Sequence, residues 1–313
     1  MKGRQHAFKS ALGGLIAALM LIVLPLLGIL LTGKDPGPYL EVPPTTRYVR
    51  HADFSWPWFA FFAFADGLLA AGLAAALRCG WARTASPTEK PDPNAVFPWW
   101  GWVGLTVCLI SWVFAWNRFP WFQSLQRHTF QPMWTGFIVF ICALTVKRAG
   151  TCLLTRHPIR FLMLFPASAA FWWFFEYLNR FVQNWYYTGA EGMSAGEYTL
   201  YSTLAFATVL PAVISMLDLL LTVPALAAGL TRCRPLRLPA SGWIPLALLL
   251  LSAAGLALIG IYPDRLFALL WVSPLFILLS LQALSGRPTL LHPLRRGDWR
   301  RVVVPALAAL ICG

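Results

Sequence analysis

Long apolar stretches separated by short polar connections make up most of this chain. Most of these stretches reach about 20 residues, the length a helix needs to cross the hydrocarbon core of a bilayer. We predict eight spans, at residues 11–32, 56–77, 98–116, 130–146, 161–187, 200–230, 243–262 and 266–284. A further apolar run begins at Val302 and continues only to Cys312. The pattern predicts an all-α polytopic transmembrane helical bundle with eight clear spans and a partial ninth.

The composition supports lipid as the solvent for most of the chain. Hydrophobic residues make up 58% and charged residues only 12%, with a mean hydropathy of +0.63. Soluble domains are only about 45 to 50% apolar. We therefore name the lipid bilayer as the main partner.

The net charge of +13 has two interpretations, nucleic-acid binding or membrane topology. If the N-terminus is cytoplasmic, 18 of the 25 Lys and Arg residues fall on the cytoplasmic side and six on the other. This asymmetry is what the positive-inside rule describes, so no nucleic-acid partner is needed. The first apolar run is too long for a signal peptide and has no cleavage site after it. We predict a bacterial inner-membrane protein with a cytoplasmic N-terminus and a retained first helix.

The six cysteines all fall within predicted spans or on the predicted cytoplasmic side. Because disulfides are rare in reducing compartments, we expect no structural disulfide. The chain has no CxxC pair, so we expect no metal site, and its histidines are badly placed to ligate a haem between helices. No cofactor is predicted.

Two polar, proline-rich connections divide the chain. Residues 1–97 form a two-helix region with an outward loop at 33–55 and a cytoplasmic linker at 84–94. Beyond it, similar features recur at a spacing near 137 residues. The pairs are Trp134 with Trp271, His157-Pro158 with His292-Pro293, and 166–170 with 305–309. They predict a parallel internal repeat, with a four-span unit at 98–238 and a partial copy at 239–313 whose counterpart of Glu176 would lie beyond Gly313.

Glu176 is the most informative polar residue, because it interrupts the aromatic span 161–187. A charge at membrane depth costs roughly 2.5 to 3.5 kcal/mol on insertion scales. Helical spacing places it on one stripe with four neighbours, Trp172, Asn179, Arg180 and Gln183, and allows an ion pair between Glu176 and Arg180. One interpretation is an outward-opening substrate or ion site lined by Trp172, Trp173, Glu176, Asn179 and Arg180. The other is a polar contact between helices, with 185–187 forming an interfacial aromatic belt.

Three other acids have functional and structural interpretations. Asp66 lies near the middle of its span and would either face Glu176 as part of the substrate site or bond locally at a bend. Asp218 lies nearer the cytoplasmic end of its helix and is either a proton or ion residue or a buried polar contact. Glu197, three residues after Ser194, fits a helix capping box better than a catalytic role.

The sequence contains no phosphate-binding glycine loop, GxSxG or HExxH motif, so it does not decide whether the protein is an enzyme. Our leading hypothesis is transport or handling of a small molecule or lipid at the polar site around Glu176. The first alternative is an integral-membrane enzyme acting on a lipid or isoprenoid, with Glu176 as general acid and Trp172 and Trp173 shaping an apolar pocket. The second is a non-catalytic membrane scaffold.

Overall fold

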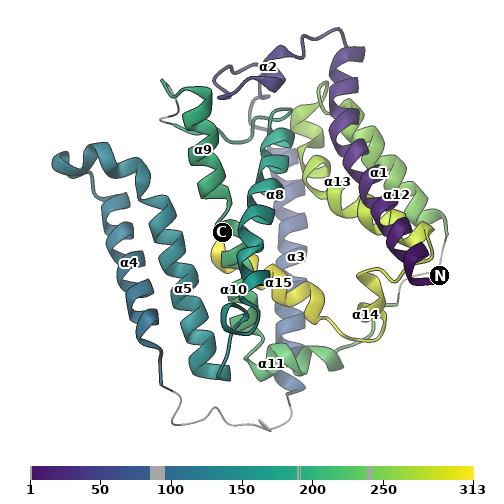
Figure 1. Ribbon diagram of the computed structural model, residues 1–313. Helices are drawn as coiled ribbons and strands as arrows, with labels where there is room; N and C mark the ends of the chain where they lie inside the picture. The colour runs from purple at the N-terminus through teal and green to yellow at the C-terminus, as the bar shows by residue number, and fades with distance from the viewer. Residues whose placement is uncertain (1, 85–95, 189, 191, 238–241) are drawn as a thin grey trace. The chain divides into compact units, whose positions relative to one another are not determined.

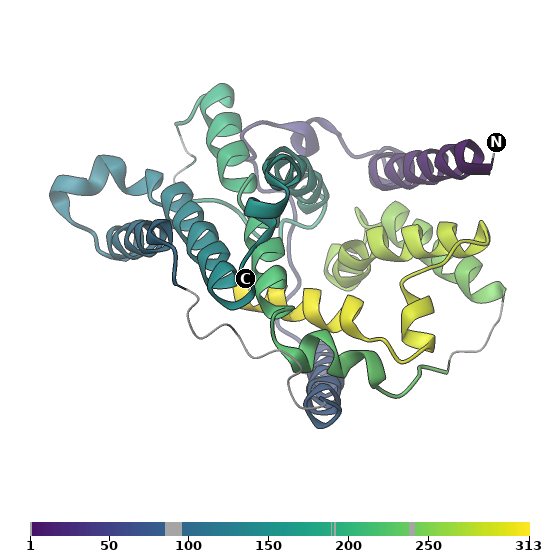
Figure 2. The ribbon, with the colours of Figure 1, turned by 60° about the horizontal axis from the view of Figure 1, so that its bottom comes forward.

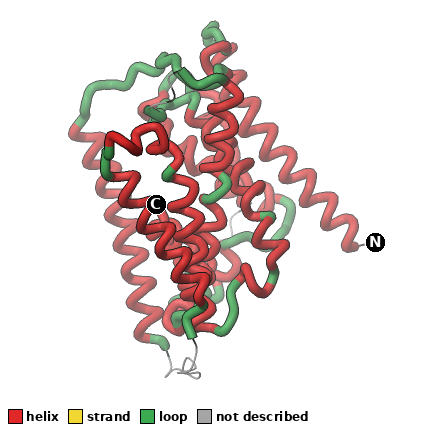
Figure 3. Tube along the Cα trace, turned by 60° about the vertical axis from the view of Figure 1, so that its left-hand side comes forward, coloured by secondary structure: helices red, strands yellow, loops and turns green. Residues whose placement is uncertain are grey.

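The structure is a computed structural model that describes residues 2–84, 96–188, 190, 192–237 and 242–313. Every regular element in these ranges is a helix, and loops or turns join them (Figure 3). The linker predicted at 84–94 lies almost entirely outside the described residues. The all-α prediction is confirmed.

Within the described residues, seven helical segments are long and apolar enough to span a membrane. They are α1 (Lys2–Leu31), α3 (Trp56–Ala82), α4 (Trp99–Trp116), α5 (Phe130–Ala149), α7 with α8 (Pro158–Leu162 and Leu164–Asn179), α9 with α10 (Ala195–Phe206 and Val209–Leu220) and α13 (Pro263–Leu284). The stretch predicted at 243–262 forms α12 (Trp243–Leu258), whose 16 residues extend about 24 Å at 1.5 Å per residue. That length is shorter than the hydrocarbon core of about 30 Å. Seven predicted spans are therefore supported, and the eighth and the internal repeat stay predictions.

Shorter helices lie between these segments or after the last of them. They are α2 (Gly37–Leu40), η1 (Pro120–His128), α6 (Leu153–Arg156), α11 (Pro224–Ala227), η2 (Gly229–Arg232), α14 (Leu291–Arg295) and α15 (Arg300–Cys312). The last of them, α15, has 13 residues and contains the partial ninth apolar run.

The chain divides into two compact units. Unit 1 comprises Met1–Phe59, Phe174–Thr199 and Arg237–His292, and unit 2 comprises Ala60–Trp173, Leu200–Leu236 and Pro293–Gly313. The division passes through α3, α8, α9 and α14, so each of these helices contributes residues to both units.

Unit 1 is built around α1, α12 and α13, which lie beside one another in Figure 2. Gly28 allows α1 to approach α12 closely, because a Cβ at this position would lie 1.9 Å from the carbonyl oxygen of Ala257. Leu178, Phe181 and Ile277 belong to the buried apolar core of the same unit. This core fixes the end of α8, where the candidate site lies.

In unit 2, α4 and α5 form an antiparallel pair joined through η1 (Figure 1). Gly104 and Gly136 face each other, and a Cβ on either would lie within 3 Å of the other's carbonyl oxygen. Small residues of this kind let membrane helices pack backbone to backbone. Helix α10 packs against α5 and α15.

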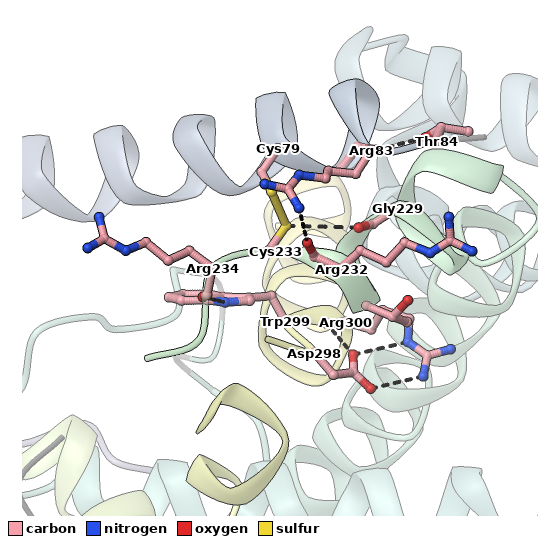
Figure 4. Close-up of a disulfide and its surroundings, with 12 residues drawn as sticks. Cys79, Arg83, Thr84, Gly229, Arg232, Cys233, Arg234, Asp298, Trp299 and Arg300 are labelled. Carbon is pink, nitrogen blue, oxygen red and sulfur yellow. Dashed lines mark hydrogen bonds and ion pairs between the residues drawn. A yellow bond between two sulfur atoms is a disulfide. The ribbon is translucent and has the colours of Figure 1, made fainter. Parts of the chain in front are cut away.

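The expectation of no structural disulfide is wrong, because Cys79 and Cys233 form one in unit 2 (Figure 4). Their Cα atoms are 6.0 Å apart, within the usual range for a disulfide. Gly80 and Gly229 bring the two segments together, since a Cβ on Gly229 would lie 2.0 Å from the carbonyl oxygen of Gly80. The charge distribution placed the cysteines within spans or on the cytoplasmic side, and it gave no sign that these two residues, 154 positions apart, are in contact.

Candidate functional site

Helix α8 ends at Asn179, earlier than the predicted span end at residue 187, and the chain then folds back. The side chain of Asn179 stabilises this reversal. Its Oδ1 accepts hydrogen bonds from the amides of Asn184 at 3.0 Å and Trp185 at 3.4 Å. Its Nδ2 donates to the carbonyl oxygen of Trp185 at 2.8 Å. The continuous polar stripe predicted through residue 183 is therefore interrupted.

Glu176 is buried, with 2% of its surface exposed, and the returning segment supplies its partners. The indole nitrogen of Trp185 donates to Oε1 at 2.8 Å, and the hydroxyl of Tyr187 donates to the same oxygen at 2.6 Å. The ring of Trp185 also stacks on Trp271, with centroids 4.9 Å apart. Trp185 and Tyr187, which one interpretation assigned to an interfacial aromatic belt, are direct partners of the carboxylate.

The predicted ion pair between Glu176 and Arg180 is not formed. The ion pairs within the described part of the chain lie elsewhere, and Arg180 bonds to the loop at 33–55 instead. Its Nη1 donates to the carbonyl oxygen of Glu41, and its own carbonyl oxygen accepts from the hydroxyl of Tyr48. The guanidinium of Arg180, just beyond the end of the helix, is engaged by the Glu41 carbonyl oxygen rather than by Glu176. Arg180 remains buried, with 7% of its surface exposed.

Gln183 attaches the same loop to the reversal. Its Oε1 accepts from the amides of Tyr48 at 3.1 Å and Val49 at 2.9 Å, and its Nε2 donates to the carbonyl oxygen of Thr46 at 2.9 Å. Its φ of +46° lies in the left-handed region, which is uncommon for a residue other than glycine. These three bonds hold the backbone in that conformation.

The loop carries its own stabilising carboxylate. Glu41 accepts hydrogen bonds from the hydroxyl of Thr45 at 2.8 Å and from the amide of Thr46 at 3.0 Å. Hydrogen bonding to Thr46 is the largest of the effects that hold the pKa of Glu41 below its usual value, with smaller contributions from Thr45 and the charge of Arg180. At the far end of the loop, His51 Nδ1 lies 2.6 Å from Asp264 Oδ1 at the start of α13.

The loop and the reversal enclose a pocket of about 270 Å³ within unit 1. Its lining residues are Pro44, Thr45, Arg47, Val49, His51, Glu176, Asn179, Arg180, Gln183, Trp185, Tyr186, Tyr187 and Ala190. The guanidinium of Arg47 lies 3.8 Å above the ring of Tyr186, in a cation–π contact. The pocket thus combines a buried acid, two arginines and an aromatic wall.

The structure brings three predicted site residues together in this pocket: Glu176, Asn179 and Arg180. Trp172 and Trp173 belong to unit 2 and do not line it. The indole of Trp173 donates to the hydroxyl of Thr203 at 2.9 Å, and both tryptophan rings contact Phe206. Their predicted substrate role has no support from the pocket.

Asp66 and Asp218 also belong to unit 2. Asp66 is exposed on α3. Asp218 forms an ion pair with Arg156 at 2.8 Å and accepts the amide of Leu153 at 2.7 Å. This arrangement connects α10 to the segment around α6, as a structural contact would. The proton or ion role of Asp218 stays a prediction.

Sequence reasoning did not place Thr45, Arg47 or His51 at the site. One signal was available, because Arg47 is among the few cations on the predicted outward side. The capping box was predicted correctly: the amide and hydroxyl of Ser194 both lie 2.9 Å from Glu197 Oε2, and the Glu197 amide donates back to the hydroxyl.

No protein-family model, curated protein or solved structure matches this chain.

Proposed function

We propose that this multi-pass helical membrane protein binds a small polar molecule or a lipid headgroup in the pocket beside Glu176, as a step in transporting or handling it. The observation that carries the proposal is a fully buried carboxylate at the wall of a pocket that also contains two arginines. Ionisable groups at membrane depth are expensive and default to functional roles. A volume of about 270 Å³ lies near the small end of ligand pockets, so a headgroup fits better than a whole lipid.

The lining residues indicate the chemistry of the ligand. Arg47 and Arg180 favour an acidic group such as a carboxylate or phosphate, which a guanidinium binds through paired hydrogen bonds. Asn179 and Gln183 are largely used in holding the backbone, so they shape the pocket more than they select the ligand. Tyr186 and Trp185 add an apolar wall.

Binding is tested by thermal shift on the purified protein in detergent, with dicarboxylates, amino acids and glycerol phosphates as probes. At least one class should raise the unfolding temperature of the wild type, and Arg47→Gln should remove that shift. Glu197→Gln, which changes an exposed acid of the same unit, is the matched control and should keep it. If no probe class shifts the wild type, or if Arg47→Gln leaves every shift intact, the pocket does not bind ligands of this chemistry.

Transport is tested separately, in proteoliposomes loaded with the binding probe in radiolabelled form. Glu176→Gln should reduce uptake or efflux, and unchanged flux for every bound probe would exclude a transport role for Glu176. The enzyme alternative predicts a different result. Lipid extracts of a deletion strain would then contain an accumulated precursor and lack a product.

A further inference from the structure

A second feature of interest lies in unit 2, around the disulfide (Figure 4). Cys79–Cys233 joins the end of α3 to the segment that follows η2. The segment before α15 binds the same place: the amide of Cys233 donates to the carbonyl oxygen of Gly297 at 3.1 Å, and the amide of Trp299 donates to that of Leu230 at 2.9 Å. The indole of Trp299 adds a bond to the carbonyl oxygen of Arg234 at 3.0 Å. Three distant segments are thus held together.

These three segments are rich in arginine. We call their eight arginines the basic cluster: Arg78, Arg83, Arg232, Arg234, Arg295, Arg296, Arg300 and Arg301. All are exposed except Arg300, which is half-buried. Asp298 is the one acid in the same segments, and Arg300 binds it through two hydrogen bonds at 3.1 and 2.9 Å. The pairing lowers the pKa of Asp298, so this acid is ionised and already bound to Arg300.

The fold therefore concentrates positive charge that its own acids do not balance. Arg83 Nη1 donates to the carbonyl oxygen of Arg232 at 3.1 Å, which ties the side chain of Arg83 to the segment that carries Arg232 and Arg234 (Figure 4). The exposed arginines on these segments all carry the same charge, so an anion bound among them is attracted by more than one of them. The disulfide and the main-chain bonds maintain this geometry.

The position of the cluster indicates which anion it meets. Arg78 and Arg83 flank the end of α3, a segment long and apolar enough to span a membrane and largely exposed along its length. Trp81 lies between them and is 58% exposed. Exposed tryptophan beside arginine at the end of a span is typical of the headgroup region of a bilayer. Basic clusters at this depth attract acidic lipids.

We propose that the basic cluster is a binding surface for the headgroups of anionic phospholipids. Arginine suits this role because its guanidinium keeps its positive charge at every physiological pH and so attracts a phosphate throughout. The inference concerns a different unit from the pocket beside Glu176 and does not depend on what that pocket binds.

The test uses the full chain purified in a neutral detergent and titrated with phosphatidylglycerol or phosphatidylcholine. Native mass spectrometry measures how much lipid stays bound. The wild type should retain phosphatidylglycerol several-fold better than phosphatidylcholine, and added salt should reduce that difference. Equal retention of the two lipids would overturn the proposal.

The variant Arg232→Gln/Arg234→Gln removes two cluster charges and should lower phosphatidylglycerol retention several-fold. Both side chains are exposed, and the bonds described above use the carbonyl oxygens of these residues, so the contacts remain. The matched control is Arg118→Gln/Arg127→Gln, two exposed arginines beside and within η1, and it should behave like the wild type. Undiminished retention in the first variant would contradict the proposal, as would an equal loss in the control.

A folding defect is distinguished by Arg232→Lys/Arg234→Lys. This variant keeps both charges and should retain most of the lipid preference. If it loses the preference while its unfolding temperature matches the wild type, charge does not determine the binding, and the proposal fails.

Discussion

Trp185 donates a hydrogen bond of 2.8 Å to the carboxylate of Glu176, nine residues earlier in the chain. The bond exists because helix α8 ends between the two residues and the chain reverses direction. An acid predicted to lie on a continuous helix thereby becomes part of a closed polar arrangement. The pocket beside it depends on this reversal.

The bond from Tyr187 to Glu176 gives the first prediction. Tyr187→Phe removes a donor from a buried carboxylate and should destabilise the protein by about 1 to 3 kcal/mol, the usual cost of leaving a buried acceptor with one partner fewer. Thermal unfolding in detergent measures the change. Tyr186→Phe keeps the ring beneath Arg47 and is the control, with little expected effect. In a Glu176→Gln background the cost of Tyr187→Phe should fall, and an unchanged cost would mean that the two groups do not interact.

Gln183 gives a second prediction, concerning the loop at 33–55. Gln183→Ala removes three hydrogen bonds to the loop, so the loop should become more accessible. Trypsin cleaves after arginine, and cleavage after Arg47 and Arg50 should become several-fold faster in the variant. Gln123→Ala, an exposed glutamine in η1, should leave the cleavage rate unchanged. Equal rates in all three proteins would show that Gln183 does not hold the loop.

The lowered pKa of Glu41 predicts a pH dependence of the same loop. The ionised carboxylate accepts hydrogen bonds from Thr45 and Thr46, so folding stabilises the charged form and depresses its pKa below the ordinary value of 4.5. The contribution of Glu41 to loop stability is therefore present above pH 4.5 and is lost as the pH falls through the lowered pKa.

Hydrogen exchange at the Thr46 amide measures this effect. After correction for the intrinsic pH dependence of exchange, protection in the wild type should decrease on acidification below pH 4.5. In Glu41→Gln, which keeps an acceptor but cannot titrate, protection should not change in this range. A wild-type profile identical to that of Glu41→Gln would contradict the assignment.

The disulfide predicts both a count of thiols and a stability difference. Alkylation of the denatured, unreduced protein should modify four cysteines, and alkylation after reduction should modify six. Reduction should lower the stability of the wild type by about 2 to 5 kcal/mol. It should have no effect on Cys79→Ser/Cys233→Ser, whereas Cys108→Ser, a change at a free cysteine, should respond to reduction like the wild type. Six modified cysteines before reduction would exclude the bridge.

Local patterns in the sequence were sufficient for the features that depend on neighbouring residues. Apolar length located seven spanning segments, and the spacing of Ser194 and Glu197 located a capping box. Both depend on contacts within a few residues, where the sequence and the energetics are directly related. The burial of Glu176 was likewise expected from its apolar surroundings.

Features formed by distant residues did not follow from the sequence. The reversal after α8 includes Gln183, whose left-handed backbone is held by Tyr48 and Val49, about 135 residues away. Helical periodicity therefore overestimated the length of the span and predicted an ion pair with Arg180 that is not formed. Cys79 and Cys233 are separated even further, and no local motif connects them.

The bridge between Cys79 and Cys233 also bears on the sidedness of the protein. The arginines around it favour a cytoplasmic position, whereas a stable disulfide is characteristic of an oxidising compartment. The arginines and the disulfide therefore predict opposite sides of the membrane for the same segment. The redox state of this bond in cells reports on which side the segment lies. In cells whose thiols are trapped with acid at harvest, a closed bridge places the arginine-rich ends outside the cytoplasm. An open one places them inside.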